Sequence, residues 1–189
     1  MSFFKQRKTA IIIFVIVVVV FSLIGCHRSL SRAVSKVEDA FFDKSLLQAD
    51  GYYTCPADQL KNCVKLSNRL LSVIGKDGQW AQVYDDLKTA RLALDDALGD
   101  RDIKRIANSN QVLVDAVAAV EAMVEAGATL PDSNDDYNAI IADFHSAQSV
   151  LDNNAYNAHV LAFRKEVLTP FPTNILRHLA FVASPETFP

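Results

Sequence analysis

Apolar side chains recur along most of this chain at the three- and four-residue steps of an α-helix. One such stripe predicts a helix over residues 29–48, able to continue directly from the apolar segment before it. A second stripe, over residues 60–74, ends at Gly75, a residue type that readily takes the left-handed position after a helix. A third, over residues 80–98, is expected to close at Gly99. Strand-like alternation is nearly absent beyond the first segment, so the pattern predicts an all-α protein.

Two further stripes follow in the second half of the chain. Residues 103–124 form a heptad seam with Asn110 at one apolar position, where it either fixes the register of a helical assembly or lies half-exposed on an ordinary helix. The stripe over residues 137–167 slips in phase at residues 152–154, which are weak helix formers, so we expect a kink or a shift of the buried face there, and an end at Pro170 and Pro172. Short connections between such helices predict an antiparallel up-and-down helical bundle.

The first segment, residues 1–26, has the layout of an export signal or a membrane anchor. Basic residues at positions 5–8 precede an uncharged run that ends at Gly25. The apolar part is slightly shorter than the roughly 20 residues that span a bilayer, a mismatch that tilt or bilayer thinning absorbs. Leu-Ile-Gly-Cys at residues 23–26 also fits a bacterial lipobox, in which the chain is cut before Cys26 and its thiol is lipidated. The sequence leaves both an uncleaved transmembrane helix and a lipidated Cys26 open.

Charge divides the chain unequally. Residues 1–25 carry three basic groups and no acidic ones, whereas the remainder carries 16 basic and 22 acidic residues. An acidic body argues against a nucleic-acid partner, which would require a basic face. Basic residues flank the apolar run on both sides, so the positive-inside rule does not decide its orientation. The signal-like layout favours a body outside the cytoplasm, attached to the membrane.

Two cysteines in the body, Cys55 and Cys63, are candidates for a disulfide if that body is exported. The alternative is a buried Cys63 on the helical stripe and a free Cys55. Zinc binding is not expected, because the two are eight residues apart with no His nearby, whereas zinc sites pair ligands at a spacing of two to four.

The remaining residue types that could carry chemistry are scattered. Asp132 opens a stretch that imitates a calcium loop, but Tyr137 stands where that loop needs Gly, so helix capping is the favoured interpretation. His145, His159 and His178 lack the three- or four-residue spacing of metal ligands on a helix. No hydrolase or nucleotide-binding fingerprint occurs. We therefore expect no catalytic residue, no metal site, no cofactor and no enzymatic activity.

Both ends of the chain carry recognisable motifs. Tyr156-Asn157-Ala-His-Val160 is followed by Phe171-Pro172 and by an aromatic end at Phe188, while an apolar segment ending in Gly-Cys precedes Val37-Glu-Asp-Ala-Phe41. These stretches resemble the C-terminal signature, the anchor and the first helix of the LemA family. The middle of the chain departs from the family pattern, and Phe163-Arg164 stands where the family usually repeats an aromatic-Asn pair. The chain resembles a divergent member.

The resemblance implies an anchored helical bundle in a bacterial cell envelope and implies no reaction. We expect a signal or anchor at residues 1–26, a helical bundle at 27–170 and an apolar tail at 171–189. The expected role is interaction or scaffolding with another envelope protein, and the alternative is a small ligand-binding or sensor module. The tail offers a candidate interaction surface, unless it packs back on the bundle; its residues are Phe171, Ile175, Leu179 and Phe181.

Overall fold

The computed structural model describes residues 2–46, 54–76, 78–131 and 134–188. Within those ranges the regular elements are all helical, which confirms the all-α prediction. The long helices and α7 have the bounds α1 Ser2–Asp39, α2 Pro56–Ile74, α3 Ala81–Asp100, α4 Ile103–Glu125, α5 Asn134–Asp152, α6 Ala155–Phe163 and α7 Thr173–Leu179. Short turns of other helix types have the bounds η1 Lys44–Leu46, η3 Gly78–Trp80 and η4 Arg164–Leu168.

The chain divides into two compact units that differ from the predicted domains. The α1 unit comprises Met1–Asp39 and His159–Pro185, and the bundle unit comprises Ala40–Ala158 and Glu186–Pro189. The predicted bundle of residues 27–170 therefore spans parts of both units. The cause lies in which side chains share a core: Phe41 packs with Tyr156 and Phe188 of the bundle unit.

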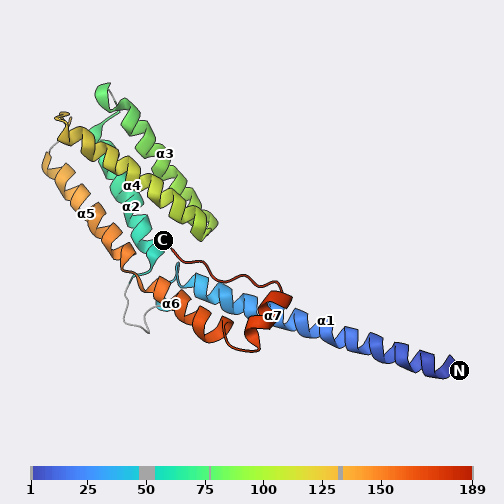
Figure 1. Cartoon of the computed structure of the whole chain (residues 1–189). Coiled ribbons are helices and arrows are strands. Elements are labelled where there is room, and N and C mark those ends of the chain that lie inside the picture. Colours follow the sequence, from blue (N-terminus) through green and yellow to red (C-terminus); the bar gives the residue numbers. More distant parts are fainter. Residues whose placement is uncertain (1, 47–53, 77, 132–133, 189) are drawn as a thin grey trace. The chain divides into compact units, whose positions relative to one another are not determined.

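The bundle unit consists of α2–α5 in antiparallel succession, drawn from teal to orange in Figure 1. The helix pairs that approach most closely are α3 with α4, α2 with α5 and α2 with α3. α4 and α5 come less close to each other, so one seam of the bundle is more open than the rest. The core is formed by fully buried side chains from every helix, among them Leu60, Leu70, Ile74, Leu87, Leu94, Ile106, Leu113, Ile140 and Phe144.

Two predicted helix ends can be compared directly with the structure. Gly75 follows α2 with a φ of 68° and donates its backbone N–H to the carbonyl of Leu71, as predicted. Gly99 does not close α3. The helix continues to Asp100, and Arg101 takes the left-handed position instead, with a φ of 58°. The guanidinium of Arg101 lies 4.4 Å from the centre of the Phe42 ring, a cation–π contact that favours this unusual conformation.

The predicted break at residues 152–154 is confirmed. α5 ends at Asp152 and α6 begins at Ala155. The side chain of Asn154 accepts a hydrogen bond from the backbone N–H of Tyr156 at 2.9 Å, so it caps the new helix. The capping residues expected before α5 include Asp132 and Ser133, which lie outside the described residues.

In the α1 unit, a single helix of 38 residues joins the apolar segment to the first stripe of the body. It ends at Asp39 and not near residue 48 as predicted, because the chain turns at Ala40 and Phe41, both fully buried. From Thr9 onward this helix is long and apolar enough to cross a membrane. One face of α1 becomes covered farther along, at Leu23, Cys26, Leu30, Val34 and Val37.

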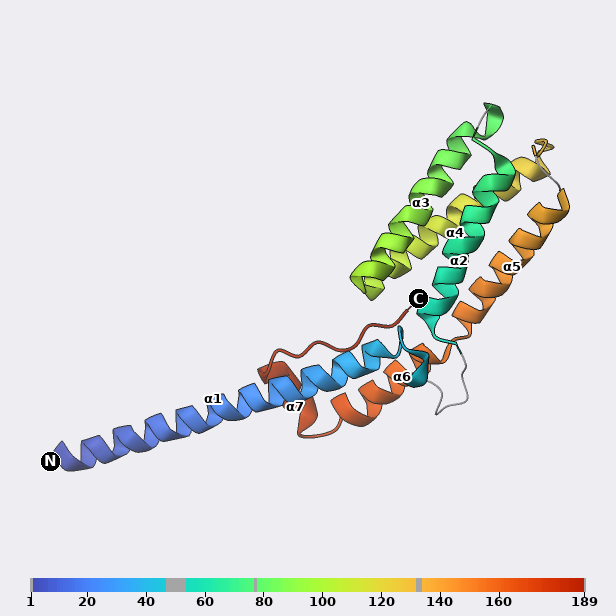
Figure 2. The ribbon, with the colours of Figure 1, turned by 180° about the vertical axis from the view of Figure 1, so that it is seen from behind.

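The apolar tail predicted at residues 171–189 contains a short helix. After α6 and the π-helical turn η4, residues 173–179 form α7, which packs beside α1 in both views (Figures 1 and 2). His27 on α1 donates a hydrogen bond from Nδ1 to the carbonyl of Ala180, just after α7, at 2.7 Å. Arg164 and Arg177 hold the following extended segment through Pro185 and Ser184.

Candidate functional site

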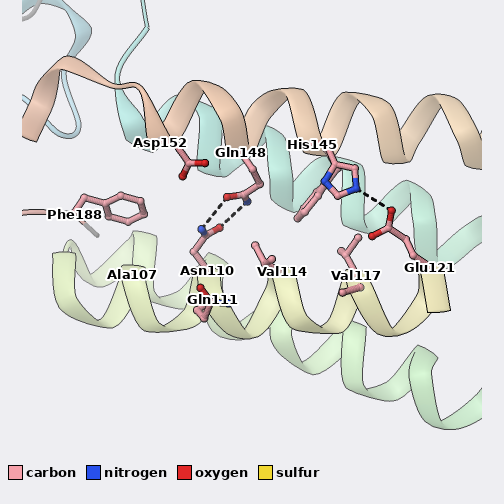
Figure 3. Close-up of a pocket in the computed structure, with 12 residues that line it drawn as sticks. Ala107, Asn110, Gln111, Val114, Val117, Glu121, His145, Gln148, Asp152 and Phe188 are labelled. Carbon is pink, nitrogen blue, oxygen red and sulfur yellow. Dashed lines mark hydrogen bonds and ion pairs between the residues drawn. The ribbon is translucent and has the colours of Figure 1, made fainter. Parts of the chain in front are cut away.

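The open seam between α4 and α5 holds a cavity of about 360 Å³. Figure 3 shows its polar side chains reaching across the gap from the two helices. Asp152 and Phe188 lie at one end, and His145 and Glu121 lie at the other. Apolar side chains, among them Val117 and Phe144, complete the wall. The volume lies within the range of small-molecule pockets.

Asn110 and Gln148 form the central bridge of this seam. Asn110 donates to Gln148 Oε1 at 3.1 Å, and Gln148 donates back to Asn110 Oδ1 at 3.0 Å. Gln148 also lies 3.5 Å from Sγ of Cys63 on α2. Asn110 is only 8% exposed, so its interpretation as a half-exposed residue was wrong. Because the pair can form in only one alignment of α4 against α5, it specifies their register.

Gln148 was not singled out from the sequence, although a signal was available. The stripe on this helix was read from Tyr137, Ile141, Phe144 and Leu151. Gln148 lies four residues after Phe144 and three before Leu151, at a position where the pattern calls for an apolar side chain. A polar residue at such a position needs a buried partner. Asn110 at the matching position of the previous helix is that partner.

At the other end of the cavity, His145 Nε2 and Glu121 Oε1 are 2.8 Å apart. The pair is exposed on the His side and partly covered on the Glu side. The pKa of Tyr137, on the same helix as His145, is raised by burial and by the charges of Glu121 and Glu125. This end of the cavity can offer the imidazole of His145 and the carboxylate of Glu121 as hydrogen-bonding groups to a small polar molecule.

Cys55 and Cys63, the candidates for a disulfide, are both buried free thiols, which fits the alternative of a buried Cys63 and a free Cys55. Cys55 is the residue before α2 and Cys63 lies eight residues along, about 12 Å at the rise of an α-helix. A disulfide requires Cα atoms within about 7 Å of each other. Burial raises the pKa of Cys63 to about 12 and raises that of Cys55 as well. Cys26, the lipidation candidate, is a half-buried free thiol on α1.

Groups of three or more His, Cys, Asp or Glu that could hold a metal ion do not occur within the described residues. His145 lies beside Glu121. His159 and His178 belong to the α1 unit. The structure thus brings none of the three histidines into a shared ligand set in the part of the chain that it describes.

The Tyr156-Asn157 motif and the C-terminal Phe188 are brought together, which sequence spacing alone could not show. The hydroxyl of Tyr156 donates to the carbonyl of Glu186 at 2.7 Å. The Asn157 side chain accepts from the Phe188 N–H at 2.9 Å and donates to the Phe188 carbonyl. The rings of Tyr156 and Phe188 both pack on Phe41. We call this arrangement the C-terminal clamp.

The four tail residues predicted as an interaction surface are all exposed. Phe171 is 80% exposed and Phe181 90%, while Ile175 and Leu179 are 51% and 55% exposed. The alternative that the tail packs back on the bundle holds for its end, where Phe188 packs on Phe41, but not for these four side chains. Other residues of the tail are buried, namely Ala180, Pro185 and Phe188.

Comparison with protein-family models found no match for this sequence. Comparisons with curated proteins and with solved structures likewise found none.

Proposed function

We propose that this protein is a membrane-anchored, non-enzymatic interaction or scaffold protein of the LemA type, located in a bacterial cell envelope. The motifs at both chain ends support the family, and the C-terminal clamp gives the Tyr156-Asn157 motif and Phe188 a shared structural purpose. The signal-like order of the first residues supports a body outside the cytoplasm.

The observation that carries the proposal is the exposure of the first half of α1. Every residue from Ile11 to Phe21 is exposed, and each of them is apolar. Leaving such side chains in water costs roughly 1.5–3 kcal/mol for each large one. A bilayer removes this cost, whereas no other described part of the α1 unit covers these residues. A membrane is therefore the environment that this helix fits.

Within this proposal the helix is an uncleaved anchor. α1 runs without interruption through Cys26, and its covered face includes Leu23 on one side of the cleavage point and Leu30 on the other. Cys26→Ser should therefore leave electrophoretic mobility and membrane retention unchanged, as judged by fractionation of cells that express the full chain. A change in electrophoretic mobility together with loss of membrane retention would show that Cys26 is lipidated.

The bundle unit is the part proposed to contact a protein partner. It carries ten Lys or Arg against nineteen Asp or Glu, so a partner with a basic face is favoured. Acidic pairs at residues 85–86 and 95–96 are exposed on α3. In-cell crosslinking followed by purification from intact membranes tests the proposal. One reproducible protein partner is expected, with its yield reduced by replacing all four of these carboxylates with amides.

A matched control replaces four exposed carboxylates on other helices, Asp115 on α4 and Asp135, Asp136 and Asp143 on α5, with Asn. The same loss of crosslinks in the control would show that net charge matters and that no particular face does. The absence of any protein crosslink with the unmodified chain would contradict a scaffold role.

A second candidate function, a ligand-binding or sensor module, is favoured by the cavity between α4 and α5. It predicts that small amides or amino acids raise the melting temperature of the full chain in detergent. Val114→Trp, which fills the cavity from the α4 side, should remove the shift, whereas Val112→Trp on the exposed face of the same helix should not. No shift with any such molecule would contradict the sensor role.

A further inference from the structure

Outside the first half of α1, the two most exposed large apolar side chains, Phe181 and Phe171, flank α7, and two further exposed ones, Ile175 and Leu179, lie on it. The α7 patch consists of Phe171, Ile175, Leu179 and Phe181. Ile175 and Leu179 lie four residues apart and so share one face of the short helix. An aromatic residue flanks the helix at each end. Isolated exposed apolar residues are ordinary, but a group of four on one short segment marks a contact surface.

Phe181 occupies a backbone position that an aromatic residue rarely takes. Its φ is 54°, and it stands where helices usually place Gly. The backbone N–H groups of Phe181 and Val182 bond to the carbonyls of His178 and Arg177, which completes a regular C-terminal cap. Because the side chain is 90% exposed, no packing within the described protein explains an aromatic residue here. A contact outside the chain does.

The patch is held at a defined level along α1. His27 bonds to Ala180, the residue directly before Phe181, and α7 packs on α1. His27 lies two residues beyond Gly25, where the uncharged run ends. At the rise of an α-helix that separation is about 3 Å. If α1 spans a bilayer, α7 lies where the helix leaves the hydrocarbon.

The charges of the α1 unit fit the same surroundings. Beyond residue 26 this unit contains six Lys or Arg and three Asp or Glu, the reverse of the balance in the bundle unit. Three of the basic residues follow the apolar run on α1, and three lie on the returning segment. They are Arg28, Arg32, Lys36, Arg164, Lys165 and Arg177. Arg28 and Arg32, which directly follow the end of the apolar run, lie where basic residues attract anionic lipid headgroups.

We propose that the α7 patch is immersed in the interfacial layer of the same bilayer that α1 spans, with anionic headgroups around the neighbouring basic residues. This inference rests on the proposed anchoring by α1. Aromatic side chains prefer the membrane–water interface, and short amphipathic helices insert about 5–10 Å into the headgroup region. α7 packs on α1 within the same unit, and its bonded residue His27 lies six residues, about 9 Å, beyond the exposed apolar run that ends at Phe21, so one bilayer covers both. The patch then fixes the tilt and rotation of α1.

The test uses tryptophan fluorescence in the full chain, reconstituted into phosphatidylcholine vesicles that contain phosphatidylglycerol. Phe181→Trp places a reporter in the patch, and Leu92→Trp places a matched reporter at an exposed position on α3. The native Trp80 is buried in the bundle unit and gives the same background in both chains. Lipids brominated near the top of the acyl chain quench a tryptophan in the interfacial layer.

The expected result is loss of the added emission in the Phe181→Trp chain and none in the Leu92→Trp chain. Replacing phosphatidylglycerol with phosphatidylcholine, or raising the salt concentration, should weaken the quenching. Vesicle flotation of the same samples separates the two possible failures. A chain that floats but whose Phe181→Trp emission is not quenched overturns this inference and leaves the anchor intact. A protein crosslink formed at position 181 in cells also overturns it, and a chain that does not float overturns both.

Discussion

Asn110 and Gln148 show how two polar side chains can define one seam of an otherwise apolar bundle. Each donates to and accepts from the other, so the two amides are mutually satisfied. The energetic benefit lies mainly in avoiding an unpaired amide, because removing one partner of a buried pair costs more than the pair itself contributes. Sequence could predict the position of Asn110 on the seam, but its partner depends on how two helices align.

This asymmetry gives a prediction for the free energy of unfolding. Asn110→Leu leaves Gln148 without its partner and should lower the free energy of unfolding by about 1–3 kcal/mol. The double variant Asn110→Leu with Gln148→Leu should recover most of that loss. Urea titration of the full chain in detergent measures both. Gln111→Leu, on the exposed side of α4, is the control. A double variant as unstable as the single one would contradict the account.

Cys63 supplies a prediction about pH. Burial raises the pKa of its thiol from 9.0 to about 12, so the folded protein holds this proton more tightly than the unfolded chain does. The contribution to stability is complete below pH 9 and is lost as the pH rises from 9 toward 12. Cys63→Ala should flatten the fall in unfolding free energy over that window, measured by urea titration at several pH values. Cys26→Ala is the control outside the bundle unit, and identical slopes for the native chain and Cys63→Ala would contradict the prediction.

At the scale of elements, helices ended at the residues predicted from local sequence only where no tertiary contact favoured another end. Gly75 closes α2 and the weak helix formers at 153–154 end α5, both as predicted. The predicted end of α3 at Gly99 was wrong, because the helix ends instead at Arg101, whose guanidinium lies over the Phe42 ring. α1 stops nine residues early because Phe41 is drawn into a core that contains residues from the far end of the chain. Such long-range competition has no local signal.

The tail was the least predictable element. Its apolar residues were recognised as too many for a loop, and they are exposed as an interaction surface requires. The formation of α7 and its packing on α1 depend on contacts such as that of His27 with Ala180, between residues 153 positions apart. The C-terminal clamp depends equally on the meeting of residues about 30 positions apart. The sequence motifs pointed to Tyr156, Asn157 and Phe188, and the structure shows the hydrogen bonds that hold the end of the chain against the first two.

The clamp gives a prediction at this scale. Asn157→Ala removes both side-chain bonds to the backbone of Phe188 and should release the end of the chain. Hydrogen exchange of the Phe188 amide should become roughly tenfold faster, since a lost bond of this kind is worth about 1–1.5 kcal/mol. Asn153→Ala removes only a bond within α5 and serves as the control. Unchanged protection of Phe188 would show that the clamp does not hold the terminus.

At the scale of the whole molecule, the two units differ in charge and in the surface they expose. The α1 unit combines an apolar helix, an apolar patch and an excess of basic residues, whereas the bundle unit is acidic and buries most of its large apolar residues. The proposed function accordingly places the α1 unit in lipid and the bundle unit in water, where it contacts the proposed partner. This difference between the two units is the basis of the proposed function.

Vesicle flotation of the chain with a charge placed inside the apolar helix tests that division most directly. Ile16→Arg puts a charge near the middle of the exposed segment, where insertion costs about 2.5–3.5 kcal/mol. Ile16→Leu is the matched control. The account predicts that the native and Ile16→Leu chains float with the vesicles, that Ile16→Arg floats less, and that a chain lacking residues 2–25 stays in the soluble fraction with its helical content intact. Undiminished flotation of the shortened chain would contradict anchoring by α1.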